Sequence, residues 1–139
     1  MSWQTYVDNL MADGSCQDSA IVGYTDAKYV WASQSGGTFS NITPQEIDSL
    51  IAKDRTSMFI SGLTLGAKKC SILRDGLQED GQWTMDIRTK SQGGEPTYNI
   101  SVGKAGTALV LVMGKEGIHG GVLNKKAFEM AKYLRDSGF

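Results

Sequence analysis

The only histidine of the chain, His119, stands in a glycine-rich segment, Gly117-Ile-His-Gly-Gly121. A histidine that serves as the base for a nucleophile needs a serine, cysteine or threonine beside it and a third group that orients its ring. No serine or cysteine lies near His119 in the sequence, so only a residue brought close by the fold could complete such a site. We therefore predict no catalytic residue, and a protein that is not an enzyme.

The longer loop Gly114-Lys-Glu-Gly-Ile-His-Gly-Gly121 lies between a predicted strand and a predicted helix, where phosphate-binding loops occur. The helix, however, opens with Gly-Val-Leu-Asn-Lys instead of Gly-Lys-Ser/Thr, and the spacing G-x-G-x-x-G is absent. We interpret the glycines as a tight connection that needs positive φ angles. A nucleotide-binding enzyme is the less favoured alternative.

The two cysteines, Cys16 and Cys70, lie 54 residues apart. A structural zinc site needs about four clustered ligands, which one histidine and two distant cysteines do not supply. We therefore predict neither a metal site nor another cofactor. A single disulfide is one alternative, but the sequence favours a reduced intracellular pair. No stretch reaches the roughly 20 apolar residues that span a bilayer, and the N-terminus does not resemble a secretory signal, so a cytoplasmic protein is expected.

Aromatic residues recur near both ends of the chain and in one predicted strand; they are Trp3, Tyr6, Tyr29, Trp31, Tyr133 and Phe139. Filling the core is the ordinary role of such rings. Tyr133, however, lies off the main apolar stripe of its predicted helix, and if the first and last helices pack side by side, the rings form one exposed patch. Flat rings suit a polyproline II helix, whose unpaired carbonyl groups accept hydrogen bonds from Trp N–H and Tyr O–H groups.

Phe128 lies on the charged side of the last predicted helix, together with Asn124, Lys125, Glu129 and Lys132. An aromatic ring in a charged face is often a contact for another protein. A lone exposed ring is the alternative, and the helix by itself does not separate the two.

Charge is divided unevenly along the 139 residues. The formal net charge is −1, but residues 1–52 carry one basic and six acidic side chains, whereas residues 53–139 carry 13 basic and nine acidic ones. The near-neutral total argues against nucleic-acid binding. The basic part favours an acidic partner, including anionic lipid, which gains about 1 kcal/mol per basic residue close to the surface. The residues concerned are Lys68, Lys69, Arg74, Arg88, Lys90, Lys125, Lys126 and Arg135.

Periodicity and turn signals predict the elements that must position these residues. Helices are predicted from about Ser2 to Ala12, Thr43 to Ala52 and Val122 to Asp136. Strands are predicted at Ala20–Tyr24, Tyr29–Ala32, Lys68–Arg74, Trp83–Lys90, Tyr98–Val102 and Thr107–Met113, with short connections that favour antiparallel pairing. We expect a single α+β domain over residues 1–139: a central antiparallel sheet with the N- and C-terminal helices packed together on one face and the short helix on the other.

Several segments together resemble the profilin family, and the resemblance covers essentially the whole chain. They are Trp3–Met11, Ala20–Tyr24, Asn41–Pro44, Gly62–Gly66, Lys69–Ile72, Met85–Lys90 and Met113–Gly121. The type is that of vertebrate profilins. Tyr29, Glu95–Tyr98 and Lys132–Phe139 resemble the brain-enriched isoform, whereas Met11–Gly14 and Ser40–Pro44 resemble the ubiquitous one, so the isoform stays open.

The resemblance implies a cytoplasmic protein of the cytoskeleton and cell cortex that binds monomeric actin and regulates its polymerisation and nucleotide exchange. It also implies binding of proline-rich filament-assembly factors and of phosphoinositides. A membrane-surface adaptor that binds phosphoinositides without a principal actin role is the alternative function. Nucleic acid is not expected as a partner.

The resemblance also assigns residues to three sites by position. The poly-proline site would comprise Trp3, Tyr6, Asn9, Trp31, Tyr133 and Phe139, with Tyr29 at its edge. The actin site would comprise Phe59, Ile60, Lys69, Ser71, Ile72, Arg74, Arg88, Lys90, Thr97, Asn99, Ile118, His119, Asn124, Lys125, Phe128 and Glu129. The phosphoinositide site would comprise Lys69, Arg88, Lys90, Lys125, Lys126 and Arg135.

Three positions depart from the family pattern. Tyr133 and Phe139 stand where many relatives have His and Tyr, so the terminal hydroxyl group is lost and ligand preference is expected to shift. Gln82 stands where an acidic residue is common, which is expected to weaken one contact with actin.

Overall fold

The fold is seen in a computed structural model that describes residues 2–139; residue 1 of the predicted domain lies outside the described part. The helices are α1 (Trp3–Met11), a 3₁₀ helix η1 (Thr38–Asn41), α2 (Pro44–Leu50), α3 (Ser57–Ser61) and α4 (Gly120–Asp136). The strands are β1 (Cys16–Gly23), β2 (Val30–Ser33), β3 (Leu63–Leu65), β4 (Lys68–Gly76), β5 (Thr84–Thr89), β6 (Asn99–Lys104) and β7 (Ala108–Gly114). Within the described residues, no helix is long and apolar enough to cross a membrane.

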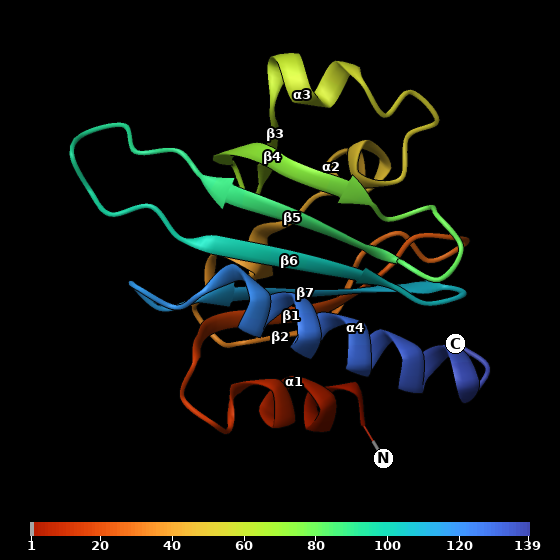
Figure 1. The fold of residues 1–139 in the computed structure, drawn as a ribbon. Helices are drawn as coiled ribbons and strands as arrows, with labels where there is room; N and C mark the ends of the chain where they lie inside the picture. The colour runs from red at the N-terminus through yellow and green to blue at the C-terminus, as the bar shows by residue number, and fades with distance from the viewer. Residues whose placement is uncertain (1) are drawn as a thin grey trace.

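The strands form one sheet in the order β2-β1-β7-β6-β5-β4-β3, and each neighbouring pair is antiparallel. Helices α1 and α4 cover one face, while η1, α2 and α3 lie on the other side of the sheet (Figure 1). The predicted α+β arrangement, with the terminal helices together on one face, is confirmed.

Alternation along the strands supplies a core on each side of the sheet, because successive side chains of a strand point to opposite faces. Met85 and Ile87 of β5 are fully buried on the side of α2 and η1. On the other side, α4 buries Leu123, Ala127 and Leu134 against β7 and α1. The whole of β7 is buried, as expected for a strand in the middle of a sheet that is covered on both faces.

Helix α2 begins where the sequence signals its start. Thr43 accepts a hydrogen bond from the backbone N–H of Glu46, and the Glu46 carboxylate accepts one from the backbone N–H of Thr43, which makes a capping box. Glu46 also accepts the backbone N–H groups of Gly66 and Ala67 at 2.9 and 3.0 Å. The same carboxylate therefore caps α2 and fixes the turn between β3 and β4.

Several elements differ from the sequence prediction. Helix α4 begins two residues before Val122, and β2 begins at Val30, so Tyr29 lies just outside the strand. The elements η1, α3 and β3 were not predicted, since segments of three to five residues are too short to show a periodicity. Strand β1 begins earlier than predicted, at Cys16, where it pairs with Gly114 of β7. The polar Asp18 within it is buried and accepts the backbone N–H of Phe39 at 2.8 Å.

The loop that leads into α4 makes the tight connection that its glycines predict. Gly117 has a φ of 83°, in the left-handed region that favours glycine. A Cβ atom on Gly114 would come within 2.9 Å of the Leu123 side chain and 3.1 Å of Ile118. One glycine is therefore needed for the turn and another for close packing.

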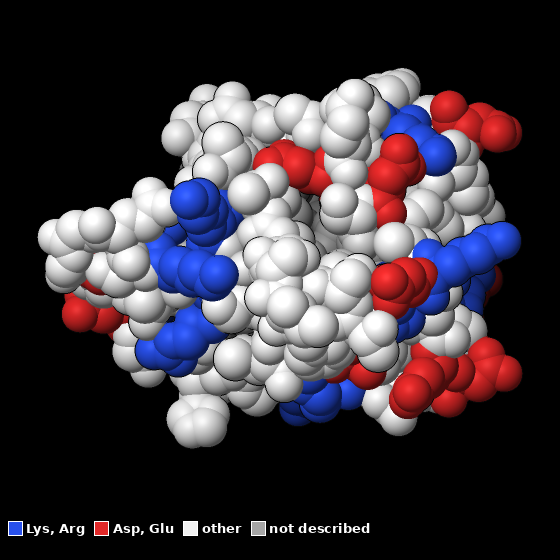
Figure 2. Space-filling model, turned by 90° about the horizontal axis from the view of Figure 1, so that it is seen from above, with Lys and Arg blue, Asp and Glu red and all other residues white. Residues whose placement is uncertain are grey.

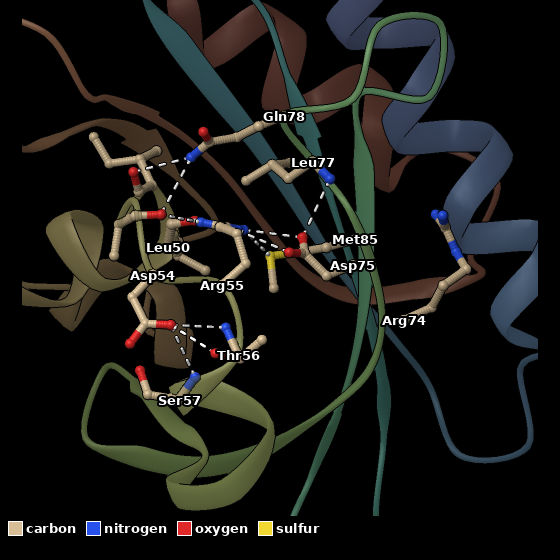
Figure 3. A network of polar contacts seen from close by, with 12 residues as sticks. Leu50, Asp54, Arg55, Thr56, Ser57, Arg74, Asp75, Leu77, Gln78 and Met85 are labelled. Atoms are coloured by element: carbon tan, nitrogen blue, oxygen red, sulfur yellow. Dashed lines mark hydrogen bonds and ion pairs between the residues drawn. The ribbon is translucent and has the colours of Figure 1, made fainter.

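A half-buried arginine, Arg55, links the segment after α2 to the end of β4. The Arg55 guanidinium donates to both carboxylate oxygens of Asp75, at 2.8 and 2.9 Å, and to the backbone carbonyls of Leu50 and Ala52 (Figure 3). The Asp75 side chain is 8% exposed and the Arg55 side chain 20% exposed. Arg74, the neighbour of Asp75 in sequence, points away from this network (Figure 3).

Candidate functional site

Five aromatic rings from both ends of the chain and from β2 form one cluster. Trp3 lies at its centre, with its ring centroid 4.8 Å from that of Trp31 and 4.9 Å from that of Phe139. Tyr6 is 5.6 Å from Trp3, and Tyr133 is 6.0 Å from Tyr6. Tyr133 and Phe139 are 52% and 41% exposed, so the cluster reaches the surface. We call these five residues the aromatic cluster.

Backbone contacts hold the rings of the aromatic cluster in place. The N–H of Phe139 donates to the carbonyl of Leu134 at 2.8 Å, and its carbonyl accepts the Thr107 hydroxyl at 3.0 Å. The indole N–H of Trp31 donates to the carbonyl of Ala27 at 3.3 Å. That N–H is therefore already bonded within the protein.

The two other residues assigned to the poly-proline site do not belong to the aromatic cluster. Tyr29 is 58% exposed, and none of the aromatic pairs among residues 2–139 includes it. Asn9 is exposed on α1 and lines a groove between α1 and α4. The structure thus brings together five of the seven predicted residues and places Asn9 beside them.

The groove between α1 and α4 has a volume of about 850 Å³ and begins at the aromatic cluster, because Tyr6 and Tyr133 belong to both. Its walls are apolar at Leu10 and Met130 and charged at its rim. The full lining comprises Thr5, Tyr6, Asn9, Leu10, Ala12, Asp13, Val122, Lys125, Lys126, Glu129, Met130 and Tyr133.

A second hollow, of about 710 Å³, lies where the exposed side of α4 meets the strands β4, β5 and β6. Phe128 is half-buried in its wall, opposite Leu73, and His119 lies at the end near the start of α4. The full lining comprises Leu73, Arg74, Gly81, Gln82, Thr84, Asp86, Asn99, His119, Gly120, Gly121, Asn124, Lys125 and Phe128. The unusual phenylalanine and the lone histidine therefore share one concave surface.

Polar contacts fix the floor of this second hollow. The Asn124 amide donates to Asp86 at 3.0 Å, which ties α4 to β5. The Arg88 guanidinium donates to Thr97 at 2.8 Å and to the side-chain oxygen of Asn99 at 3.0 Å. Asn99 and Asn124, which line the hollow, are thus held in defined positions, and so are Arg88, which contacts Asn99, and its partner Thr97.

The surface continues from the second hollow over the outer edge of the sheet. Phe59 and Ile60 on α3 are 50% and 89% exposed, and α3 packs beside β4. Lys69 and Ser71 alternate with buried residues on β4, and Lys90 follows β5, with its backbone N–H bonded to the Lys69 carbonyl at 2.9 Å. Seen from above, a compact group of Lys and Arg side chains lies beside the loop that joins β5 to β6 (Figure 2).

Four basic residues of the predicted sites are exposed and make no ion pair within residues 2–139: Lys69, Arg88, Lys90 and Lys125. Exposed cations without an acidic partner are available to an acidic ligand. This set belongs both to the predicted actin site and to the predicted phosphoinositide site.

Two basic residues assigned to phosphoinositide are engaged elsewhere. The Arg135 guanidinium stacks at 4.7 Å from the ring of Trp83 and donates to the Lys104 carbonyl. The Lys126 side chain is 16% exposed and bonds to the segment after α1. Both side chains are therefore engaged within the protein, and their assignment to phosphoinositide stays a prediction.

Two residues assigned to actin also differ from expectation. Ile72 is 9% exposed and packs in the core on the α2 side of the sheet, so little of it is accessible, and its assignment to actin stays a prediction. Ile118 is half-buried and packs against the core on the α4 side. Gln82 has a partner inside the protein, because its oxygen accepts a hydrogen bond from Arg74 at 2.9 Å.

One residue of this surface was missed in the sequence. A β-bulge between Ile72 and Arg74 leaves Leu73 on the outer face of β4, where it is 55% exposed beside Phe128 in the second hollow. The alternation of Lys69, Ser71 and Leu73 was the available signal, since every second residue of a strand shares a face.

The residues with reactive side chains are placed without a catalytic arrangement. His119 is exposed and precedes the first turn of α4 as its N-cap. Cys16 and Cys70 are free and buried, and burial raises the pKa of the Cys70 thiol to about 11. Among residues 2–139, no three His, Cys, Asp or Glu side chains lie close enough together to hold a metal ion.

Comparisons with known proteins agree with this geometry. The family model described as Profilin matches residues 1–139. The chain is 72% identical to human profilin-2 and 60% identical to bovine profilin-1, each over 137 residues that cover 99% of this chain and 98% of the relative. The crystal structure of mouse profilin IIa in complex with a double repeat from the FH1 domain of mDia1 superposes with a TM-score of 0.98, at 70% identity and full coverage of both chains.

Proposed function

The chain belongs to the profilin family, and from that premise we propose that it binds monomeric actin and a proline-rich segment at the same time, on two separate surfaces. Profilins are actin-binding proteins without enzymatic activity. The observation that carries the proposal is the separation of the two surfaces: the aromatic cluster lies at the chain ends, and the second hollow lies on the far side of α4 over β4, β5 and β6.

The aromatic cluster is the surface for the proline-rich segment. Mouse profilin IIa, which is 70% identical, was solved with a double repeat from the FH1 domain of mDia1. In this chain, Trp3, Tyr6, Trp31, Tyr133 and Phe139 offer tilted rings on which proline rings stack. The Phe139 side chain contributes its ring alone, so a side-chain hydrogen bond from this end of the site must come from a neighbour such as the Trp3 indole or the Tyr6 or Tyr133 hydroxyl group.

The second hollow and the neighbouring edge of the sheet form the actin surface. Phe128 and Leu73 supply a half-buried apolar centre, and the exposed cations around them suit an acidic partner. Phe59 and Ile60 extend the apolar area over the edge of β4.

Acceleration of nucleotide exchange on actin requires no catalytic residue in this chain. A protein that binds an open form of actin more tightly than the closed form shifts the population toward the open form, from which nucleotide leaves more easily. An adaptor that carries such an actin monomer and a proline-rich assembly factor together would deliver monomers to growing filament ends. Such an adaptor would work in the cytoplasm, at the cytoskeleton and the cell cortex.

Capture on polyproline resin tests the two-surface proposal. The protein should be retained by the resin, and monomeric actin added afterwards should be retained only when the protein is present. A polyglycine resin is the control for non-specific adsorption. Release of the protein by actin would contradict the proposal, because it would mean that the two surfaces overlap.

Binding to phosphoinositide membranes is the second candidate, favoured by the exposed cations Lys69, Arg88, Lys90 and Lys125. Because all four also belong to the proposed actin surface, vesicles that contain phosphoinositide and monomeric actin should exclude one another in co-sedimentation. Lipid binding should fall steeply as salt rises past about 0.15 M, where charges are screened over about 8 Å, whereas polyproline binding should hardly change. Sedimentation of actin and the protein together with the vesicles would contradict the assignment of both ligands to one surface.

A further inference from the structure

Helix α1 carries two rings of the aromatic cluster, yet its own sequence stabilises it weakly. It has nine residues, no side-chain hydrogen bond at its N-cap and no basic residue in its last turn. Helices this short are marginal by themselves, and the carbonyl groups of their last turn lack partners inside the helix. The position of Trp3 and Tyr6 therefore depends on what holds α1 from outside.

Lys126 of α4 supplies the missing cation at the C-terminal end of α1. Its ammonium group donates to the carbonyl of Leu10 at 2.8 Å, to Asp13 at 2.8 Å and to the Ser15 hydroxyl at 3.1 Å. Three partners use all three of its hydrogens. A positive charge at this end of a helix is also favoured by the helix dipole.

The local environment confirms that Lys126 is committed to this contact. Its side chain is 16% exposed, although lysine is ordinarily a surface residue. The hydrogen bond from Lys126, followed by those from Ser15, holds the pKa of Asp13 well below its usual range. The Asp13 carboxylate therefore stays ionised throughout the physiological pH range.

Lys126 lies along the same groove as the rings of the aromatic cluster. Tyr6 and Tyr133 meet across the groove between α1 and α4 with their centroids 6.0 Å apart. Farther along α1, beyond Leu10, Lys126 meets Asp13 across the same groove. The two contacts fix the separation and the register of the two helices.

We propose that Lys126 is a positioning residue for the proline-rich ligand: it fixes α1 against α4 and so keeps Tyr6 and Trp3 in register with Tyr133 and Phe139. The inference rests on the proposed function of the aromatic cluster. It separates Lys126 from its neighbour Lys125, which is exposed on the same helix and has no ion-pair partner among residues 2–139. Adjacent lysines thus serve different surfaces.

The variants Lys126→Gln and Lys125→Gln form a matched pair, since each removes one positive charge from the same helix. Affinity for a polyproline peptide is measured by tryptophan fluorescence, and affinity for monomeric actin in parallel. Lys126→Gln should lose about tenfold in peptide affinity, roughly the effect of one charge-assisted hydrogen bond, and keep its actin affinity within about twofold. Lys125→Gln should show the opposite pattern.

Two further readouts separate positioning from general stability. Nuclear Overhauser contacts between the Tyr6 and Tyr133 rings should weaken in Lys126→Gln and persist in Lys125→Gln. Lys126→Arg, which keeps the charge and the donors, should restore most of the peptide affinity. A variant that was only less stable would show unchanged affinities below its melting temperature and intact ring contacts, and this result would overturn the proposal.

Other outcomes are equally decisive. If Lys126→Gln binds peptide like the parent protein but loses actin or phosphoinositide vesicles, the Lys126 ammonium serves that surface and the inference is wrong. If Lys126→Gln does not fold, Asp13→Asn takes its place. This variant removes the carboxylate and leaves the contact of Lys126 with Leu10. Unchanged peptide affinity and ring contacts in Asp13→Asn would then count against the proposal. Failure of the parent protein to bind polyproline would reject the proposed function itself, so the two failures are distinguishable.

Discussion

Replacing Trp3 by alanine is expected to weaken the binding of a proline-rich peptide about thirtyfold. Trp3 is the one ring in direct contact with three others of the aromatic cluster, Tyr6, Trp31 and Phe139. A central aromatic anchor of an interface contributes on the order of 2 kcal/mol, which corresponds to this factor. Isothermal titration calorimetry with the peptide measures the change. Calorimetry is used in place of fluorescence because the variant lacks one tryptophan.

The matched control for Trp3→Ala is Phe59→Ala, which removes an exposed ring from the proposed actin surface. Phe59→Ala should leave peptide affinity unchanged and weaken actin binding, whereas Trp3→Ala should do the reverse. Circular dichroism and thermal melting establish that both variants are folded. A folded Trp3→Ala that still binds polyproline normally would show that the aromatic cluster is not the proline site.

The parts of the fold that could be predicted from the sequence are those where a local pattern has one structural solution. The capping box of Thr43 and Glu46 marks the start of α2 because both residues satisfy backbone groups of the first turn. The apolar run of β7 predicts a strand covered on both faces, and it is buried throughout. The stripe of α4 predicts the face that packs on the sheet.

The parts that could not be predicted depend on contacts between distant segments. Alternation along β4 indicates the outward face of Leu73, but the bulge beside it is defined by pairing with β5 and has no local signal. Lys125 and Lys126 are indistinguishable in sequence, yet only the second reaches the end of α1. Matching by family position likewise does not show that Ile72 packs in the core.

Contacts between distant segments also decide which basic residues are available to a partner. Net charge along the sequence separates an acidic first part from a basic second part, but the structure selects among the bases. Arg74 and Lys126 form ion pairs and Arg135 stacks on Trp83, whereas Lys69, Arg88, Lys90 and Lys125 make no ion pair within residues 2–139. The sequence can therefore predict an acidic partner. Which basic side chains are available to that partner is known only once the ion pairs and hydrogen bonds inside the protein are known.

Replacing Arg55 by alanine is expected to lower the free energy of unfolding by about 3–5 kcal/mol at pH 7. The substitution leaves the Asp75 carboxylate, 8% exposed, without its bidentate partner, and an uncompensated buried charge costs about this much. The carbonyls of Leu50 and Ala52 lose their donor at the same time. Urea unfolding of both proteins measures the difference, with Lys28→Ala as the control, since the ion pair of Lys28 with Asp48 is exposed and contributes little.

The pH dependence of this loss identifies its cause. In the parent protein, burial acts to raise the pKa of Asp75, but the hydrogen bonds from Arg55 and the backbone of Leu77 outweigh it and hold the pKa below its ordinary value. The pair therefore stabilises the fold above about pH 4, the ordinary pKa of an aspartate, and the contribution disappears as the pH falls through the lowered pKa. In Arg55→Ala, burial dominates and raises the pKa of Asp75, so the variant loses stability as the pH rises through that value. The difference between the two proteins should accordingly be larger at pH 7 than at pH 4, whereas a loss of packing alone would give the same difference at both.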